Sequence, residues 1–244
     1  MAQFLLAALM MPLAACSVHV GGDDDGQPGV AAQGTGDTRT YAVVDFTEVD
    51  LRGADNVDVR VGPGFSVRAD GDSEVLDHLK IEKVGNALRI GRQRSSGWNW
   101  GGRHARISVT LPRLTATAIA GSGDITVDQV QGRSFKGEGA GSGNLNVGRL
   151  TVDEARFDLA GSGSLKLAGT ARSLSVNIAG SGDVDAGGLK ASTADVSVAG
   201  SGSVRADVNG PAKVSIMGSG DVDLGSNAKC QTSKMGSGSI RCGG

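Results

Sequence analysis

Apolar and polar residues alternate along most of the chain from about residue 41 onward. One such stretch contains Ala155, Phe157 and Leu159, and another contains Ala194, Val196 and Val198. A period of two places the apolar side chains of a segment on one face, which is typical of a β-strand with one buried side. The segments are short and rich in β-branched residues, which favours strands over helices.

A Gly-Ser-Gly tripeptide punctuates this alternation seven times. It begins at Gly121, Gly141, Gly161, Gly180, Gly200, Gly218 and Gly236, at intervals of 18 to 20 residues. A near-constant period of this length is typical of a solenoid. Glycine tolerates positive φ and close approach of a neighbouring coil, so each tripeptide predicts a tight corner, with its Ser hydroxyls stacked in a ladder. We therefore predict an all-β fold, a right-handed single-stranded parallel β-helix with coils of about 20 residues.

The pattern divides the predicted head domain, residues 41–244, into two parts. Residues 116–244 give regular coils, each with a strand, a corner, a second strand and a polar return. Residues 41–115 predict less regular coils of the same kind, with a corner at Gly53. Within them, Ser73–Leu79 predicts a short helix that Ser73 caps. Irregular end coils are expected because a bare end would template pairing with another chain.

The first residues resemble a bacterial lipoprotein signal peptide. An apolar run, Phe4–Met10, is too short to span a bilayer, and it is followed by Leu13-Ala14-Ala15-Cys16, which resembles a lipobox. We expect residues 1–16 to be this signal, with Cys16 as the lipidated residue; an ordinary signal peptide with an incidental Cys is the alternative. Ser17 after the Cys points to the outer membrane of a Gram-negative bacterium. Residues 17–40 are polar and predict a flexible tether.

The ordered segments also resemble a known family. Residues Phe46–Leu51, Leu111–Leu114 and Ala120–Ile125 together resemble the head domain of bacterial auto-transporter adhesins, over roughly residues 41 to 242. The Gly-Ile-Asn tripeptide for which that family is named is missing from this chain. The resemblance implies a β-helical fold, a cell-envelope location and no known enzymatic activity.

Composition narrows the possible chemistry. The net charge of −2 gives no electrostatic attraction to nucleic acid. Aromatic residues are only 3% of the chain, and strand parity places Phe135 and Phe157 inside, so a sugar-cleaving β-helix has few groups to hold its substrate. No nucleotide, haem or zinc motif is found, and we expect no cofactor and no metal. A calcium array is disfavoured because Asp alternates with Ser or Asn after the corners, which predicts a neutral polar ladder instead.

One loop carries both tryptophans of the chain. Trp98, Asn99, Trp100 and Arg103 lie in a Gly-rich segment flanked by further arginines. Paired aromatics beside Arg suit contact with a protein or glycan. In the alternative interpretation, the tryptophans fold back as a lid over the N-terminal end of the solenoid.

Cys230 and Cys242 both have inward parity in the last coil. In an oxidising envelope they could form a disulfide that closes this end. They could equally be two buried thiols that fill space as Ala and Leu do in other coils.

The sequence as a whole predicts a non-enzymatic envelope lipoprotein that presents a rigid solenoid surface as an adhesin or binding module. Its expected partners are the membrane, through the lipid, and an unknown protein or glycan, with homo-oligomers possible. A structural or self-associating envelope component without a dedicated ligand is the second hypothesis. A carbohydrate-active β-helix enzyme is the third.

Overall fold

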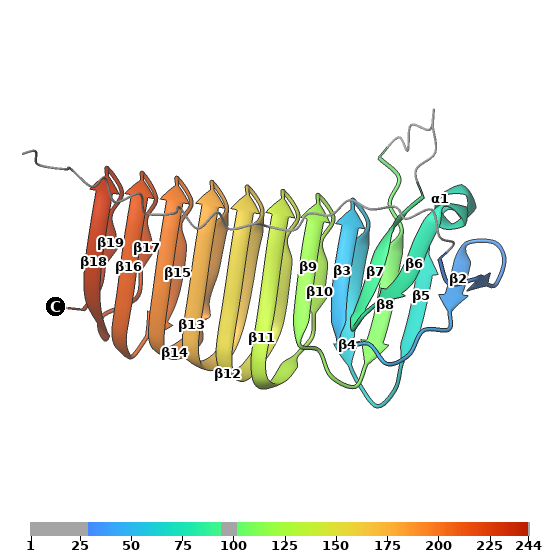
Figure 1. The fold of residues 1–244 in the computed structure, drawn as a ribbon, viewed down its shortest axis with the longest axis horizontal. Coiled ribbons are helices and arrows are strands. Elements are labelled where there is room, and N and C mark those ends of the chain that lie inside the picture. The colour runs from blue at the N-terminus through green and yellow to red at the C-terminus, as the bar shows by residue number, and fades with distance from the viewer. Residues whose placement is uncertain (1–28, 94–101, 244) are drawn as a thin grey trace, which may run out of the picture.

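The structure, a computed structural model, describes residues 29–93 and 102–243 (Figure 1). Among these residues α1 (Ser73–Asp77) is the one helix. The N-terminal strands are β1 (Ala32–Gln33), β2 (Thr38–Tyr41), β3 (Glu48–Gly53), β4 (Asn56–Val61), β5 (Ser66–Asp70), β6 (Leu79–Val84), β7 (Ala87–Arg92) and β8 (Arg106–Leu111). The strands that follow are β9 (Ala116–Gly121), β10 (Ile125–Val127), β11 (Val130–Gly141), β12 (Leu145–Gly161), β13 (Ser164–Gly180), β14 (Asp183–Gly200), β15 (Val204–Val208), β16 (Gly210–Gly218), β17 (Val222–Asp223), β18 (Ala228–Gly236) and β19 (Ile240–Arg241).

From β9 onward the chain forms a stack of parallel coils. Each strand pairs with its counterpart in the next coil, so that Phe157, Val176, Val196 and Val214 lie one above another. The same register places each corner glycine on the next, from Gly121 to Gly236. Six turns of 18 to 20 residues separate the first and last Gly-Ser-Gly. The structure confirms the predicted all-β solenoid with coils of about 20 residues.

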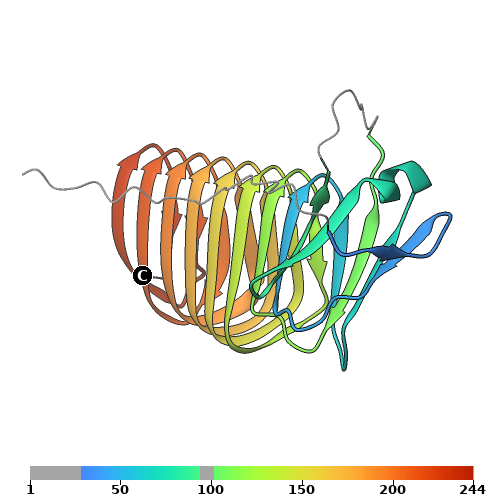
Figure 2. The same ribbon diagram turned by 45° about the vertical axis from the view of Figure 1, so that its right-hand side comes forward.

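The regular coils are shaped by continuous, bent strands. β12, β13 and β14 each run along one wall, turn at the rounded side of the coil, and continue along the other wall to a corner glycine (Figure 2). The ladder between β12 and β13 shifts register between Val147 and Leu150, at the rounded side, where one coil is a residue shorter. The return that the sequence predicted as a separate polar segment is therefore part of the strand, and it absorbs the differences in coil length.

The glycine corners hold neighbouring coils in close backbone contact. Gly161 has a φ of +130°, and a Cβ there would overlap the carbonyl oxygen of Gly141 in the preceding coil. A Cβ on Gly163 would likewise overlap the carbonyl oxygen of Gly143. Positive φ and this contact together require glycine.

Backbone amides, and not Ser hydroxyls, join one corner to the next. The amides of Ser162 and Gly163 both donate to the Gly141 carbonyl, at 2.9 and 3.2 Å. Ser142, Ser162, Ser181 and Ser201 are exposed, and none of their hydroxyls bonds another in this part of the structure. The predicted hydroxyl ladder was wrong because the Ser side chains lie outside the corner.

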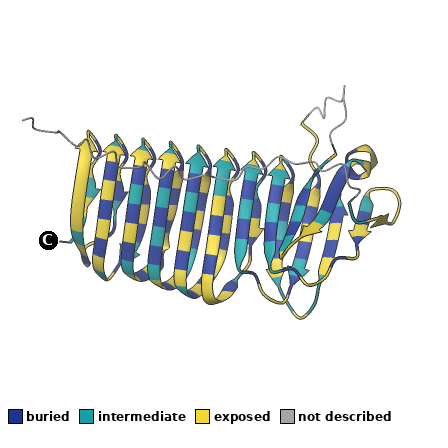
Figure 3. Ribbon diagram, in the orientation of Figure 1, coloured by how far each residue is buried: buried dark blue, intermediate teal, exposed yellow. Residues whose placement is uncertain are grey.

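The core fills the space between the two walls. Alternate residues are buried along the coils from β12 to β16, which gives the banded strands of Figure 3, whereas β18 in the last coil is mostly exposed. Phe135 and Phe157 are 1% and 0% exposed, and their rings lie 6.0 Å apart, as the parity of their strands predicted. The aromatic side chains of the regular coils therefore serve packing.

The N-terminal part is a cap whose layers are not stacked in chain order. β3 and β4 form a layer that pairs in parallel with β9 and β10, with Gly53 (φ +132°) placed on Gly121. The later strands β7 and β8 pair with the far side of that layer, also in parallel. β6, β5 and β2 then add antiparallel pairings, β6 to β7, β5 to β8 and β2 to β5. The corner at Gly53 is confirmed, but the description of residues 41–115 as coils of the same kind was incomplete.

Two further boundaries differ from the sequence predictions. Part of the predicted tether, residues 17–40, is folded, since β1 and β2 form a hairpin and Arg39 donates to Asp77 at 2.6 Å. Helix α1 is capped by Asp72, which accepts a bond from the Glu74 amide, and not by Ser73. A carboxylate and a hydroxyl are both good caps, so the sequence alone could not separate these neighbours.

The C-terminal coil closes the core with different chemistry. Cys230, on β18, and Cys242, just after β19, form a disulfide between the two walls. At the inward position that Ile216 occupies one coil earlier, the last coil carries Lys234. The Lys234 ammonium donates to the Gly238 carbonyl at 2.9 Å. An inward charge at a free strand edge disfavours pairing with another sheet.

Candidate functional site

One wall of the solenoid displays two outward residues from each coil just after the corner. One residue that faces the core lies between each such pair; these inward residues are buried from Ile125 to Val222, and Ile240 in the last coil is partly buried. The outward residues flanking them form two rows that run along the axis. We name the first the corner row: Asp124, Asn144, Ser164, Asp183, Ser203, Asp221 and Ser239. We name the second the charge row: Lys166, Asp185, Arg205, Asp223 and Arg241.

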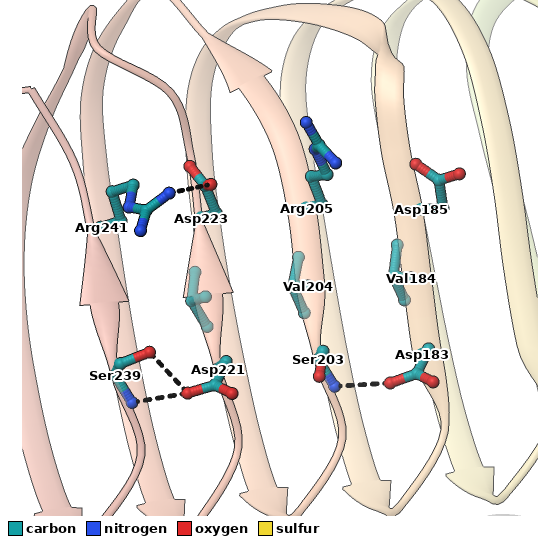
Figure 4. A pocket seen from close by; sticks show the side chains of 11 residues that line it. Asp183, Val184, Asp185, Ser203, Val204, Arg205, Asp221, Asp223, Ser239 and Arg241 are labelled. Atoms are coloured by element: carbon teal, nitrogen blue, oxygen red, sulfur yellow. Dashed lines mark hydrogen bonds and ion pairs between the residues drawn. The ribbon is translucent and has the colours of Figure 1, made fainter.

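In the corner row, side-chain oxygens bond the backbone of the following coil. Asp183 accepts from the Ser203 amide at 2.9 Å, and Asp221 accepts from both the amide (2.9 Å) and the hydroxyl (2.5 Å) of Ser239 (Figure 4). The same contact joins Asn144 to the Ser164 amide at 3.0 Å. These bonds satisfy amides where the strand ladder is interrupted. A polar ladder is therefore present where the alternation of Asp with Ser or Asn predicted one, but its acceptors include Asp carboxylates, so it is not the neutral ladder expected.

The hydrogen bonds of the corner row also affect the pKa of Asp221. The hydrogen bonds from Ser239 to Asp221, first from its hydroxyl and then from its amide, lower the pKa of that carboxyl. Asp221 is therefore ionised at neutral pH.

The charge row alternates in sign from coil to coil. Asp185 lies between Lys166 and Arg205, and Asp223 lies between Arg205 and Arg241. Opposite charges on adjacent strands stabilise a sheet face by roughly 0.2–1 kcal/mol a pair. Arg241 pairs with Asp223 at 3.6 Å, whereas no bond or ion pair joins the Arg205 guanidinium to the described part of the chain.

A shallow groove of about 400 Å³ lies over the C-terminal half of these rows. Four carboxylates and two guanidinium groups line it, together with Ser203 and Ser239 and the valines between them (Figure 4). The polar side chains belong to Asp183, Asp185, Asp221, Asp223, Arg205 and Arg241. The groove thus offers acceptors and donors in a regular array and carries an excess of two negative charges.

Of the binding loop proposed from the sequence, the structure describes Arg103 but not the other candidate residues. Trp98, Asn99 and Trp100, like Cys16, fall outside the described residues. Arg103 is described, and its guanidinium pairs with Asp72 (3.3 Å) and Glu74 (3.2 Å) beside α1. The structure therefore gives Arg103 contacts within the cap, and it does not test the proposed binding loop.

The groove was not predicted from the sequence because only the corner glycines and the residue after each corner were compared, and not the charge row two positions further along. Every charge-row residue is the fifth after the first glycine of its corner, as Asp185 is after Gly180 and Arg205 after Gly200. Aligning the corners would have shown the alternating charges. No group of three or more His, Cys, Asp or Glu side chains that could hold a metal occurs within residues 29–93 and 102–243.

These features define a β-solenoid with a glycine corner in each coil and a polar groove on one wall. Residues 45–228 match the family described as "Putative auto-transporter adhesin, head GIN domain", and the chain belongs to that family. No curated protein matches the sequence. In the described part of the chain no helix is long and apolar enough to cross a membrane.

Solved structures share the fold at low sequence identity. A putative adhesin from Bacteroides fragilis has a TM-score of 0.75 and 22% identity, with 84% of this chain and 95% of that chain covered. A putative adhesin from Parabacteroides merdae has a TM-score of 0.66 and 17% identity, covering 88% and 99%. A "putative lipid binding protein" from Parabacteroides distasonis also has a TM-score of 0.66, with 23% identity, and covers 86% and 98%. At these identities the likeness establishes the fold.

Proposed function

We propose that this chain is a non-enzymatic binding module of the cell envelope, an adhesin that uses the rigid wall of its solenoid as the contact surface. The observation that carries this proposal is the groove over the charge row, where side chains from successive coils form one periodic polar surface. Membership of an adhesin family supports it.

The carboxylates of the groove support binding over catalysis. Glycoside cleavage needs a pair of carboxyl groups, one of them an acid of raised pKa, across a bond held between them. Here Asp183 and Asp221 are tied to amides of the next coil, and the pKa of Asp221 is lowered. Both carboxylates serve as hydrogen-bond acceptors, and the lowered pKa makes Asp221 a poor general acid.

Binding is tested directly with the purified full chain immobilised on a sensor surface. Envelope glycans, proteins and lipid vesicles are passed over it, and the flow-through is analysed for cleaved products. The proposal expects saturable binding without product. Turnover of any ligand would contradict it, and binding of none would favour a structural envelope component.

We further propose that the protein is held at the membrane by a lipid on Cys16, in the outer membrane of a Gram-negative cell. The lipobox-like Leu13–Cys16 supports this. Metabolic labelling with an alkyne fatty acid should label the wild-type chain in the membrane fraction, and Cys16→Ser should lose both label and membrane association. A labelled Cys16→Ser chain would refute the assignment.

A further inference from the structure

The groove over the charge row has features that specify the chemistry of its ligand. Its lining repeats with the coils, which are about 4.8 Å apart. Carboxylate and guanidinium alternate along the charge row, so like groups recur every second coil, roughly 9.6 Å apart. A periodic surface of this kind matches an extended polymer with a regular repeat.

Hydrogen-bonding capacity remains open at these side chains. Asp185 Oδ1 accepts from the Gly187 amide at 3.2 Å, and Asp183 Oδ1 accepts from the Ser203 amide at 2.9 Å. Among the described residues none donates a hydrogen bond to the second carboxylate oxygen of either residue, and a carboxylate group has about four acceptor positions. Arg205, between Asp185 and Asp223, has its donors available. A ligand would therefore meet acceptors and donors on adjacent coils.

The charge pattern of the groove disfavours two classes of polymer. Four carboxylates against two guanidinium groups repel an anionic chain such as a polyuronate. A polyamine would be attracted by the carboxylates but would leave Arg205 facing a like charge. A hydroxyl group both donates and accepts, so a neutral chain of hydroxyls satisfies the two kinds of position equally.

We infer that this groove binds a neutral, hydroxyl-rich glycan that lies along the solenoid axis. Asp183, Asp185 and Asp223 accept from its hydroxyls, and Arg205 donates to its oxygens. No aromatic side chain lines the groove, so no sugar ring stacks on an aromatic face and the polar side chains supply the specific contacts. Affinity then depends on how many coils the glycan spans. The inference rests on the proposed binding function and specifies its ligand class.

The test starts with a glycan array that carries neutral, uronate-containing and free-amine oligosaccharides, probed with the full chain. The best neutral ligand is then titrated by calorimetry in lengths from two to six sugars. Affinity should rise until the oligosaccharide spans Asp185 to Arg241, three coil steps or about 14 Å, and then level off.

Variants locate the site. Arg205→Gln should weaken binding about fivefold and Asp185→Asn about threefold, since each removes a charge-assisted hydrogen bond in an exposed groove. Lys213→Gln is the matched control: it removes a positive charge from an exposed position on the opposite wall, in β16. It should leave affinity unchanged.

Several results would overturn the inference. One is binding of charged oligosaccharides only, and another is an equal effect of Arg205→Gln and Lys213→Gln on affinity. The third is that no glycan binds at 10 mM, a concentration at which a ligand with a binding free energy of about −3 kcal/mol would be half bound. If the chain instead binds a protein or a lipid vesicle, the glycan inference fails while the binding function survives. If it binds nothing, both fail.

Discussion

At the scale of single residues, glycine has two separate roles in the corner. The first glycine supplies positive φ, as at Gly161, and also lies against the carbonyl of the preceding corner. The second glycine, as at Gly163, is buried, and contact with the preceding corner alone leaves no room for a side chain. The corner therefore depends on backbone geometry, and Ser is the one position of the three whose side chain reaches solvent.

Substitution at a corner should be costly. Gly161→Ala adds a Cβ both at positive φ and against the Gly141 carbonyl, and should lower the free energy of unfolding by about 3 kcal/mol. Gly132→Ala is the control, since Gly132 lies in β11 with open space around it. Denaturant titration of both variants measures the difference. Equal stability of the two would show that the corner does not require glycine.

The hydrogen bonds of the corner row should lower the pKa of Asp221 by a measurable amount. The bonds from Ser239 lower the pKa of Asp221 in the folded state below its unfolded value. Its contribution to stability is therefore complete above the unfolded pKa and is lost as pH falls through the folded pKa. Carboxyl NMR titration should find Asp221 below the ordinary Asp range. Ser239→Ala should raise it partway, since the amide bond stays; no change would contradict the assigned cause.

At the scale of the element, the repeated coil could be predicted because its signals are local and periodic. The corner spacing and the alternation around Phe157 gave the strands, their faces and the parallel stack. The register beyond the rounded side could not be predicted, since coils of 18 to 20 residues differ in length and the difference is absorbed there. The groove lies before that side, at a constant distance from each corner, so the corner spacing alone is sufficient to place Arg205 beside Asp185.

In the described structure, strand β18 of the last coil has no further strand on its outer edge. The inward Lys234 on β18 should keep this edge unpaired. Lys234→Val continues the apolar row of Ile216 and removes the inward charge. We expect this variant to form a dimer through β18 edges, seen as a concentration-dependent increase in sedimentation coefficient.

The control for this edge prediction is Lys229→Val. Lys229 lies on the same strand but is exposed on the outside of the coil. It loses the same charge without changing the inward row, and should stay monomeric. Dimers of both variants, or of neither, would contradict the role given to Lys234.

At the scale of the whole molecule, the two ends of the stack are closed by different means. The C-terminal end uses a disulfide and an inward lysine. The N-terminal end uses a cap in which the order of layers is rearranged and antiparallel strands are added. The repeat marks only the corner at Gly53 in this cap and not the order of its layers, because β3 pairs with β9 across more than 60 intervening residues. Such long-range pairing leaves no local pattern, so it could not be predicted.

Removal of the cap should expose an edge. A fragment of residues 116–244 leaves β9 and β10 without their partners β3 and β4. We expect it to form oligomers that grow with concentration in sedimentation experiments, while residues 29–244 remain monomeric. A monomeric, fully folded fragment would show that the cap does not protect the stack.

The central claim is that side chains from successive coils form one binding surface along the wall. The most direct measurement is a crystal structure of the chain with a neutral oligosaccharide from the array. The account predicts sugar density lying along the axis over Asp185, Arg205 and Asp223. Density confined to another surface, such as the opposite wall or the cap, would contradict it.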